Sequence, residues 1–118
     1  MFAETLKKVV DNVDGGIAAV VMGLDGIPVE TYVREAGKLD VTTVAMEFSF
    51  ILTQVKKAGE SLAVGNLEEL SVKAQGLTLI LRMISPQYFI AVAMTSTGNF
   101  GKARFLARLA TPSLVAAL

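Results

Sequence analysis

The stretch LDVTTVAMEFSFILTQVKKAGESL, from Leu39 to Leu62, decides the fold. At about 1.5 Å per residue it predicts a helix roughly 35 Å long. Its strongest apolar face has the i, i+3, i+4 spacing of a helix that lies on a core. That face consists of Val41, Val44, Ala45, Phe48, Leu52 and Val55. Met46 and Phe50 lie off this face, where they are either further core residues or part of an interface. We therefore expect the helix to bury one side against its own sheet and the other against something else.

The residues before this helix predict one short helix and two strands. Apolar residues at helical spacing from Phe2 to Val13 predict an amphipathic helix, which Gly15-Gly16 ends. The nearly all-apolar run from Ile17 to Met22 is typical of a strand that is covered on both faces. An Asp-Gly turn leads into a second strand from Ile27 to Val33. Pro28 lacks a backbone N–H, so this strand is expected at an edge of the sheet or to begin at the proline.

The residues after the long helix predict three strands and a final helix. Alternating polar and apolar residues from Asn66 to Gln75 indicate a strand with one polar face. Two better buried strands follow, at Leu77–Ile84 and Tyr88–Thr95. The next apolar stripe predicts a helix from Phe100 to Ala110. Pro112 is expected to interrupt that helix, with Thr111 capping a further short helix or the chain continuing as a frayed tail.

The fold class that follows is α/β, more narrowly α+β, in the order α-β-β-α-β-β-β-α. Because several strands are apolar on both faces, helices should cover both sides of a five-stranded, mainly antiparallel sheet. We expect the long helix on one face and the two terminal helices on the other. Asp40 is the expected N-cap of the long helix.

Composition limits the classes of function. A chain of 118 residues with 53% hydrophobic content is expected to form a single domain, residues 1–118. Eleven basic residues balance eleven acidic ones, which does not favour a nucleic-acid partner. Cysteine and histidine are absent, which removes thiol chemistry and the usual general base, and no cofactor is expected. No segment predicts a signal peptide or a membrane span, so a cytoplasmic location is expected.

Candidate catalytic groups have simpler structural interpretations. The glutamates Glu47, Glu60, Glu68 and Glu69 are not spaced as acid–base pairs, and we expect solvated roles for them. Serines have no histidine to activate them. Gly98 and Gly101 could bind an anion at a helix start, but capping and close packing are favoured. An arginine finger for a GTPase is a further hypothesis, against which surface salt bridges are the favoured role of Arg34, Arg82, Arg104 and Arg108.

Two motifs in their places along the chain resemble the Roadblock/dynein light chain family. These are the hairpin VMGLDGIPVET, from Val21 to Thr31, and the passage AVAMTSTGNFGKARFLARLA, from Ala91 to Ala110. Together with the order of the elements, the likeness covers nearly the whole chain, and it is greatest to the MglB-like members of bacteria and archaea. A last helix broken at Pro112 would depart from that pattern.

The resemblance implies a homodimer in which the third strand pairs antiparallel with its copy, while the two long helices lie side by side. Such pairing would also protect an edge strand that is otherwise prone to aggregation. In this sequence the matching segments are Asn66–Gln75 and Leu39–Leu62. The expected dimer and partner interface consists of Met46, Phe50, Thr53 and Lys57 on the helix and of Leu67, Glu69, Ser71 and Lys73 on the strand.

The function that the resemblance implies is regulation of a small Ras-like GTPase, MglA-like, without a donated arginine. The alternative is a constitutive light-chain-like adaptor or scaffold that does not affect GTP hydrolysis. An enzyme or small-molecule sensor is disfavoured, because the residues form no catalytic constellation.

Overall fold

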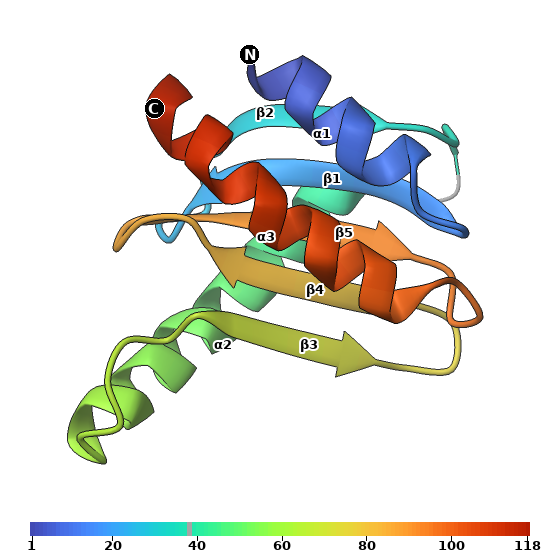
Figure 1. The fold of residues 1–118 in the computed structure, drawn as a ribbon. Helices are drawn as coiled ribbons and strands as arrows, with labels where there is room; N and C mark the ends of the chain where they lie inside the picture. The colour runs from blue at the N-terminus through green and yellow to red at the C-terminus, as the bar shows by residue number, and fades with distance from the viewer. Residues whose placement is uncertain (38) are drawn as a thin grey trace.

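The computed structural model describes residues 1–37 and 39–118 and contains the predicted order of elements. Three helices and five strands follow one another along the chain (Figure 1). They are α1 (Phe2–Asp11), β1 (Gly16–Gly23), β2 (Pro28–Val33), α2 (Val41–Ser61), β3 (Glu69–Lys73), β4 (Thr78–Met83), β5 (Tyr88–Met94) and α3 (Phe100–Ala117). The strands form one antiparallel sheet in the order β2-β1-β5-β4-β3. The edges of the sheet are therefore β2, which begins at Pro28 as expected, and β3.

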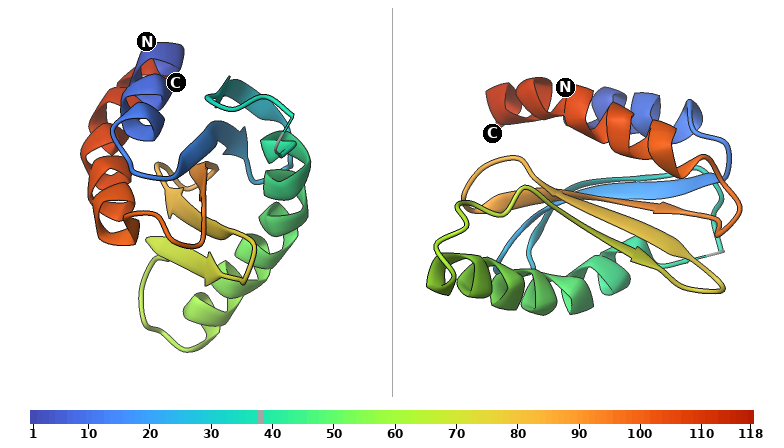
Figure 2. Two further views of the ribbon diagram at one scale, coloured as in Figure 1. Left: turned by 90° about the vertical axis from the view of Figure 1, so that its right-hand side faces the viewer. Right: turned by 60° about the horizontal axis from the view of Figure 1, so that its bottom comes forward.

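The helices cover the two faces of the sheet in the predicted partition. Figure 2 shows α1 and α3 together on one face and α2 alone on the other. Alternation along β4 divides the apolar side chains between these layers. Ile80 belongs to the core beneath α1 and α3, whereas Leu79 and Leu81 belong to the core beneath α2. Both cores are almost entirely apolar because β1, β5 and most of β4 are buried on both sides, and the buried polar side chains are Ser49 and Thr78 among the described residues.

The α2 helix lies over β1 and β2 and extends past the sheet toward the end at which β3 begins (Figure 1). Of its predicted apolar face, Val41, Ala45 and Leu52 are buried, and Val44 and Phe48 are half-buried against the same core. Val55, one turn farther on, is only half-buried and is not part of that core. The C-terminal half of α2 is therefore packed less closely on its own sheet than its N-terminal half.

Asp40 caps α2 as predicted. Its carboxylate accepts hydrogen bonds from the Thr43 hydroxyl at 2.9 Å and from the Thr43 backbone N–H at 3.2 Å. These bonds stabilise the ionised form, so they hold the pKa of Asp40 below its usual value. The cap satisfies one of the backbone N–H groups that a helix leaves without a partner in its first turn.

We predict that Asp40 makes the stability of the protein depend on pH in the acid range. A pKa that is lower in the folded state stabilises the fold above the unfolded pKa, and this contribution is lost as the pH falls through the folded pKa. Asn at position 40 keeps an oxygen acceptor but does not titrate. Asp40→Asn should therefore lose less thermal stability than the wild type between about pH 6 and about pH 3. Differential scanning calorimetry across this range measures the effect, and equal losses in both proteins would show that the cap contributes none of it.

The expected break at Pro112 is wrong, because α3 continues through it to Ala117. Proline in a helix interior lacks a donor and crowds the preceding turn, at a cost of about 3 kcal/mol. Leu114, beyond the proline, is fully buried in the core beneath α1 and α3 and holds the last turn in place. The Thr111 hydroxyl donates to the Ala107 carbonyl at 3.1 Å instead of capping a new helix. The chain thus keeps the uninterrupted last helix that the family resemblance implies.

Candidate interaction surface

The outer edge of β3 is an unpaired row of backbone groups. The strand is hydrogen-bonded to β4 on one side, where Met83 N–H donates to the Glu68 carbonyl and Ala74 N–H donates to the Leu77 carbonyl. In an antiparallel ladder the backbone groups of successive residues point alternately toward and away from the neighbouring strand. The N–H and C=O groups of Glu69, Ser71 and Lys73 therefore point outward from the sheet.

The side chains of β3 divide between the two faces of the sheet. Leu70 and Val72 pack against the core beneath α2. Glu69 and Lys73 lie on the α3 face, where the Lys73 ammonium is 5.0 Å from the centre of the Phe100 ring. Leu67, which was expected on the strand, instead precedes β3 and is half-buried against the α2 core. The strand is shorter than predicted, and it presents an apolar side toward α2 and a polar side toward α3.

Glu69 joins the edge strand to its neighbours through two arginines. Its carboxylate lies 2.7 Å from Arg104 Nε on α3 and 3.6 Å from Arg82 Nη1 on β4, and the Glu69 side chain is only 14% exposed. Arg82 Nε is buried and has no hydrogen-bond partner among the described residues. The expected solvated role of Glu69 is therefore wrong, since its carboxylate is shielded and paired. The expected salt bridges of Arg82 and Arg104 are confirmed.

We predict that Glu69→Gln destabilises the fold by about 1–3 kcal/mol, because it leaves the shielded Arg82 and the half-exposed Arg104 without their counter-charge. Glu68→Gln is the matched control, since the adjacent Glu68 is exposed and its substitution should change the free energy of unfolding by less than about 0.5 kcal/mol. Denaturant unfolding at one fixed protein concentration measures both. Equal effects of the two substitutions would contradict a structural role for the Glu69 pairs.

The four interface residues predicted on α2 have different surroundings. Phe50 is 69% exposed and Lys57 is exposed, so within this chain Phe50 is not a core residue. Met46 is 43% exposed and lies near Gly26 in the turn between β1 and β2. Thr53 is half-buried, and its hydroxyl donates to the Ser49 carbonyl at 3.0 Å. Phe50 is the most exposed aromatic side chain among the described residues.

Further apolar side chains, which the periodicity did not single out, are exposed on α2 and just after it. Ile51 on α2 is 47% exposed, and Leu62 and Val64 just after the helix are 72% and 75% exposed. Leu62 and Val64 line a groove of about 550 Å³ between the end of α2 and the start of β3, together with Val55 and Leu67. A run of apolar residues directly after a helix was the available sequence signal for Leu62 and Val64.

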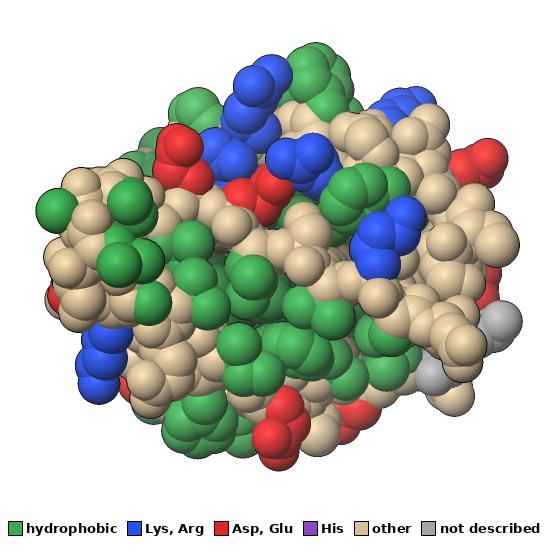
Figure 3. All heavy atoms as spheres, turned by 90° about the horizontal axis from the view of Figure 1, so that it is seen from below, with side chains coloured by type: hydrophobic (Ala, Val, Ile, Leu, Met, Phe, Trp, Pro, Cys, Tyr) green, Lys and Arg blue, Asp and Glu red, His purple; other side chains and the backbone are tan. Residues whose placement is uncertain are grey.

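Figure 3 looks onto the β3 edge and shows how these features combine. Hydrophobic side chains gather in a broad band across the middle of this face, and acidic and basic side chains lie around it. Leu67, Leu70 and Val72 are partly buried against the α2 core, so part of each side chain remains exposed at this edge of the sheet. An apolar area beside an unpaired strand edge is the typical form of a protein interface.

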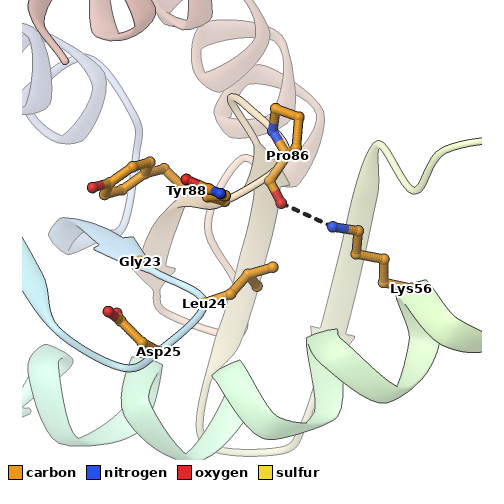
Figure 4. A pocket seen from close by; sticks show the side chains of 7 residues that line it. Gly23, Leu24, Asp25, Lys56, Pro86 and Tyr88 are labelled. Carbon is orange, nitrogen blue, oxygen red and sulfur yellow. Dashed lines mark hydrogen bonds between the residues drawn. The ribbon is translucent and has the colours of Figure 1, made fainter.

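The pocket drawn in Figure 4 offers no catalytic arrangement. It has a volume of about 420 Å³ and lies between the β1–β2 turn, the β4–β5 turn and α2. The Lys56 ammonium donates to the Pro86 carbonyl at 2.9 Å, and the Asp25 carboxylate accepts from the Ile27 N–H at 3.0 Å. Both charged groups that line the pocket thus have intramolecular partners. Among the described residues, no acidic side chains group together in a way that would hold a metal ion.

All four arginines make contacts within the chain. Arg82 and Arg104 pair with Glu69, and Arg34 Nη1 donates to the Val13 carbonyl at 3.4 Å. The Arg108 guanidinium lies 5.7 Å from the centre of the Phe105 ring, on the face of the molecule opposite α2. Arg104 is half exposed and lines the groove beside β3, where its guanidinium is held by Glu69.

Comparisons with solved structures agree with this architecture. MglC from Myxococcus xanthus matches with a TM-score of 0.70 and 38% sequence identity, over 98% of this chain and 97% of that one. A Roadblock/LC7 domain from Streptomyces avermitilis matches with a TM-score of 0.84 and 14% identity, over 97% and 94% of the two chains. The gliding protein MglB from Thermus thermophilus matches with a TM-score of 0.82 and 13% identity, over 94% and 83%.

Other comparisons give no match. No protein-family model matches the chain, and no curated protein does. In the part of the chain that the structure describes, no helix combines the length and the apolar character that crossing a membrane requires. Among the matches reported, the one to MglC has substantial sequence identity, whereas the other two show a shared fold only.

Proposed function

Because the chain belongs to the Roadblock/LC7 family, among its Mgl-type members, we propose that it is a cytoplasmic, non-enzymatic homodimer that regulates a small Ras-like GTPase of the MglA kind. The observation that carries this proposal is the coincidence of an unpaired β3 edge with an apolar band on the same side of the molecule. Within the described chain the outward backbone groups of β3 have no neighbouring strand, and the apolar band is only partly covered. Both are accounted for if a second copy pairs with β3 and the α2 helices of the two copies meet.

Two arguments support a dimer through this face. An open strand edge next to exposed apolar side chains is an aggregation hazard, which isologous pairing removes. The other edge differs, because β2 begins at Pro28, which lacks an N–H, and the Tyr32 hydroxyl donates to Asp11 of α1 at 2.8 Å, while Val29 and Val33 are each 41% exposed. The β3 edge combines outward backbone groups with a neighbouring groove that Val55, Leu62, Val64 and Leu67 line in part. The predicted interface residues Ser71 and Lys73 lie on this edge strand, whereas Phe50 is exposed on α2.

The paired α2 helices supply the proposed surface for the GTPase. Exposed Phe50 and Ile51 offer apolar contacts of the size found in protein interfaces, and exposed Lys57 adds a charge near them. The switch segments of a Ras-like GTPase are ordered by the γ-phosphate of GTP, so a partner that binds them distinguishes GTP from GDP. Each arginine of the described chain has a contact within the chain. Stimulation of hydrolysis would therefore come from repositioning of the GTPase's own catalytic groups.

Two measurements with a purified MglA-like GTPase test this function. In a pull-down we expect retention of the GTPase with a GTP analogue and much weaker retention with GDP. In a turnover assay we expect faster GTP hydrolysis, which Arg34→Ala and Arg108→Ala leave unchanged. Equal or absent binding in the two nucleotide states would contradict the proposal, and loss of stimulation in either arginine variant would show that an arginine is donated.

A scaffold that does not affect hydrolysis is the second candidate function, and one observation favours it. The likeness to MglB is at the level of fold, with 13% identity, whereas the likeness to MglC reaches 38%. The surface chemistry of MglB therefore does not transfer residue by residue to this chain. Binding that is independent of nucleotide state, together with unchanged GTP turnover, would favour the scaffold over the regulator.

A further inference from the structure

The edge residues of β3 restrict how two copies can pair. An outward-facing residue on one antiparallel strand must stand opposite an outward-facing residue on the other, because only then do their N–H and C=O groups meet. The outward-facing residues within the strand are Glu69, Ser71 and Lys73. A two-fold axis can therefore pass through an outward residue or through Leu70 or Val72, and each choice gives a different register.

We infer that the axis passes through Ser71, so that Ser71 stands opposite Ser71 of the second copy and Glu69 stands opposite Lys73. This inference rests on the proposed dimer and specifies its register. Ser71 is the middle residue of the strand Glu69–Lys73, so this register alone opposes every residue of one strand to a residue of the other. All outward backbone groups of the strand then find partners.

The alternative registers leave backbone groups unpaired. Axes through Leu70 or Val72 place Lys73 opposite Leu67 or Glu69 opposite Gln75, and both of these opposing residues lie outside the strand. Axes through Glu69 or Lys73 oppose identical charges directly, which destabilises an antiparallel pair. Unpaired backbone groups at an interface carry a desolvation cost comparable to that of a lost hydrogen bond.

Side chains on both faces fit the Ser71 register. On the α2 face, Leu70 stands opposite Val72 of the second copy, which continues the apolar core across the axis. On the α3 face, the small Ser71 side chain lies at the axis, where two identical side chains must fit. Glu69, already paired with Arg82 and Arg104, stands opposite the second copy's Lys73, so the opposing charges are of opposite sign.

Cysteine substitutions measure this register, because the natural chain contains no cysteine. In the inferred register the two Cα atoms of residue 71 are about 5.5 Å apart, which suits a disulfide. The two copies of residue 70, or of residue 72, would be offset along the strands and too far apart. Ser71→Cys should therefore form a disulfide-linked dimer under mild oxidation roughly tenfold faster than Leu70→Cys or Val72→Cys.

A mixed-chain experiment covers the case in which a disulfide at position 71 is geometrically disfavoured. Leu70→Cys and Val72→Cys chains, combined and oxidised, should cross-link to each other in preference to themselves. Faster self-linking of Leu70→Cys or of Val72→Cys would overturn the register while leaving the dimer intact. Sedimentation of the reduced proteins separates this result from failure of the proposed dimer, since a monomeric mass would overturn both. A reduced dimer with no cross-link in any of these variants would place the interface away from β3 and overturn the register.

Discussion

Ser71→Pro should convert the dimer into a folded monomer. Proline removes the outward N–H of Ser71 and places its ring where the second strand would lie, while the bonds of β3 to β4 remain. We expect the substitution to weaken association by about 3 kcal/mol or more, which corresponds to a roughly hundredfold or greater rise in the dissociation constant. Sedimentation equilibrium measures the dissociation constant, and circular dichroism reports whether the fold is kept.

Two substitutions make this result specific to the edge. Ser71→Ala keeps the backbone N–H and should leave the dimer intact. Val72→Pro removes an N–H that points toward β4, so it should destabilise the fold itself. If Ser71→Pro remained dimeric with the wild-type dissociation constant, pairing through the β3 edge would be wrong.

Phe50→Lys should weaken the dimer, or its complex with the GTPase, far more than it weakens the fold. The Phe50 side chain is 69% exposed in the single chain, so its loss should change the free energy of unfolding by less than about 0.5 kcal/mol. Aromatic residues at the centre of an interface contribute about 2 kcal/mol or more, so the dissociation constant should rise roughly thirtyfold. Sedimentation equilibrium and the GTPase pull-down measure the two associations separately.

Phe105→Lys provides the same chemical change on the opposite layer of the molecule. Phe105 is a 48% exposed residue of α3, remote from α2, and its substitution should leave both associations unchanged. A Phe50→Lys chain that unfolds would show that Phe50 contributes to the core, and equal effects of the two substitutions would show a non-specific response to the added charge.

Periodicity and end signals predicted most of the fold. The helix-spaced residues of α2 and the alternating residues of β4 faced the layers that their patterns indicated. Asp40 was identifiable as a cap from its position before an apolar run. These features are local, because a residue's place in a helix turn or a strand pleat determines which way its side chain points.

Tertiary contacts decided what the sequence could not show. The helix continues through Pro112 because Leu114 is buried against residues far along the chain. The preference of single residues for helix does not include the stabilisation that this burial gives. Glu69 is shielded because β4 and α3 bring Arg82 and Arg104 to it from far along the chain. The spacing of Phe50 left it open between core and interface. It is exposed because it lies on the side of α2 away from Ala45 and Leu52, which are buried against the sheet.

Hydrogen exchange at the outward amides of β3 tests the central claim most directly. Nuclear magnetic resonance can follow the N–H groups of Glu69, Ser71 and Lys73 at protein concentrations above and below the dissociation constant. Pairing of two copies predicts slow exchange of these amides at high concentration and fast exchange on dilution, while the inward amides of Leu70 and Val72 stay protected at both. Fast exchange of the outward amides at every concentration, with the inward amides protected, would contradict pairing through this edge.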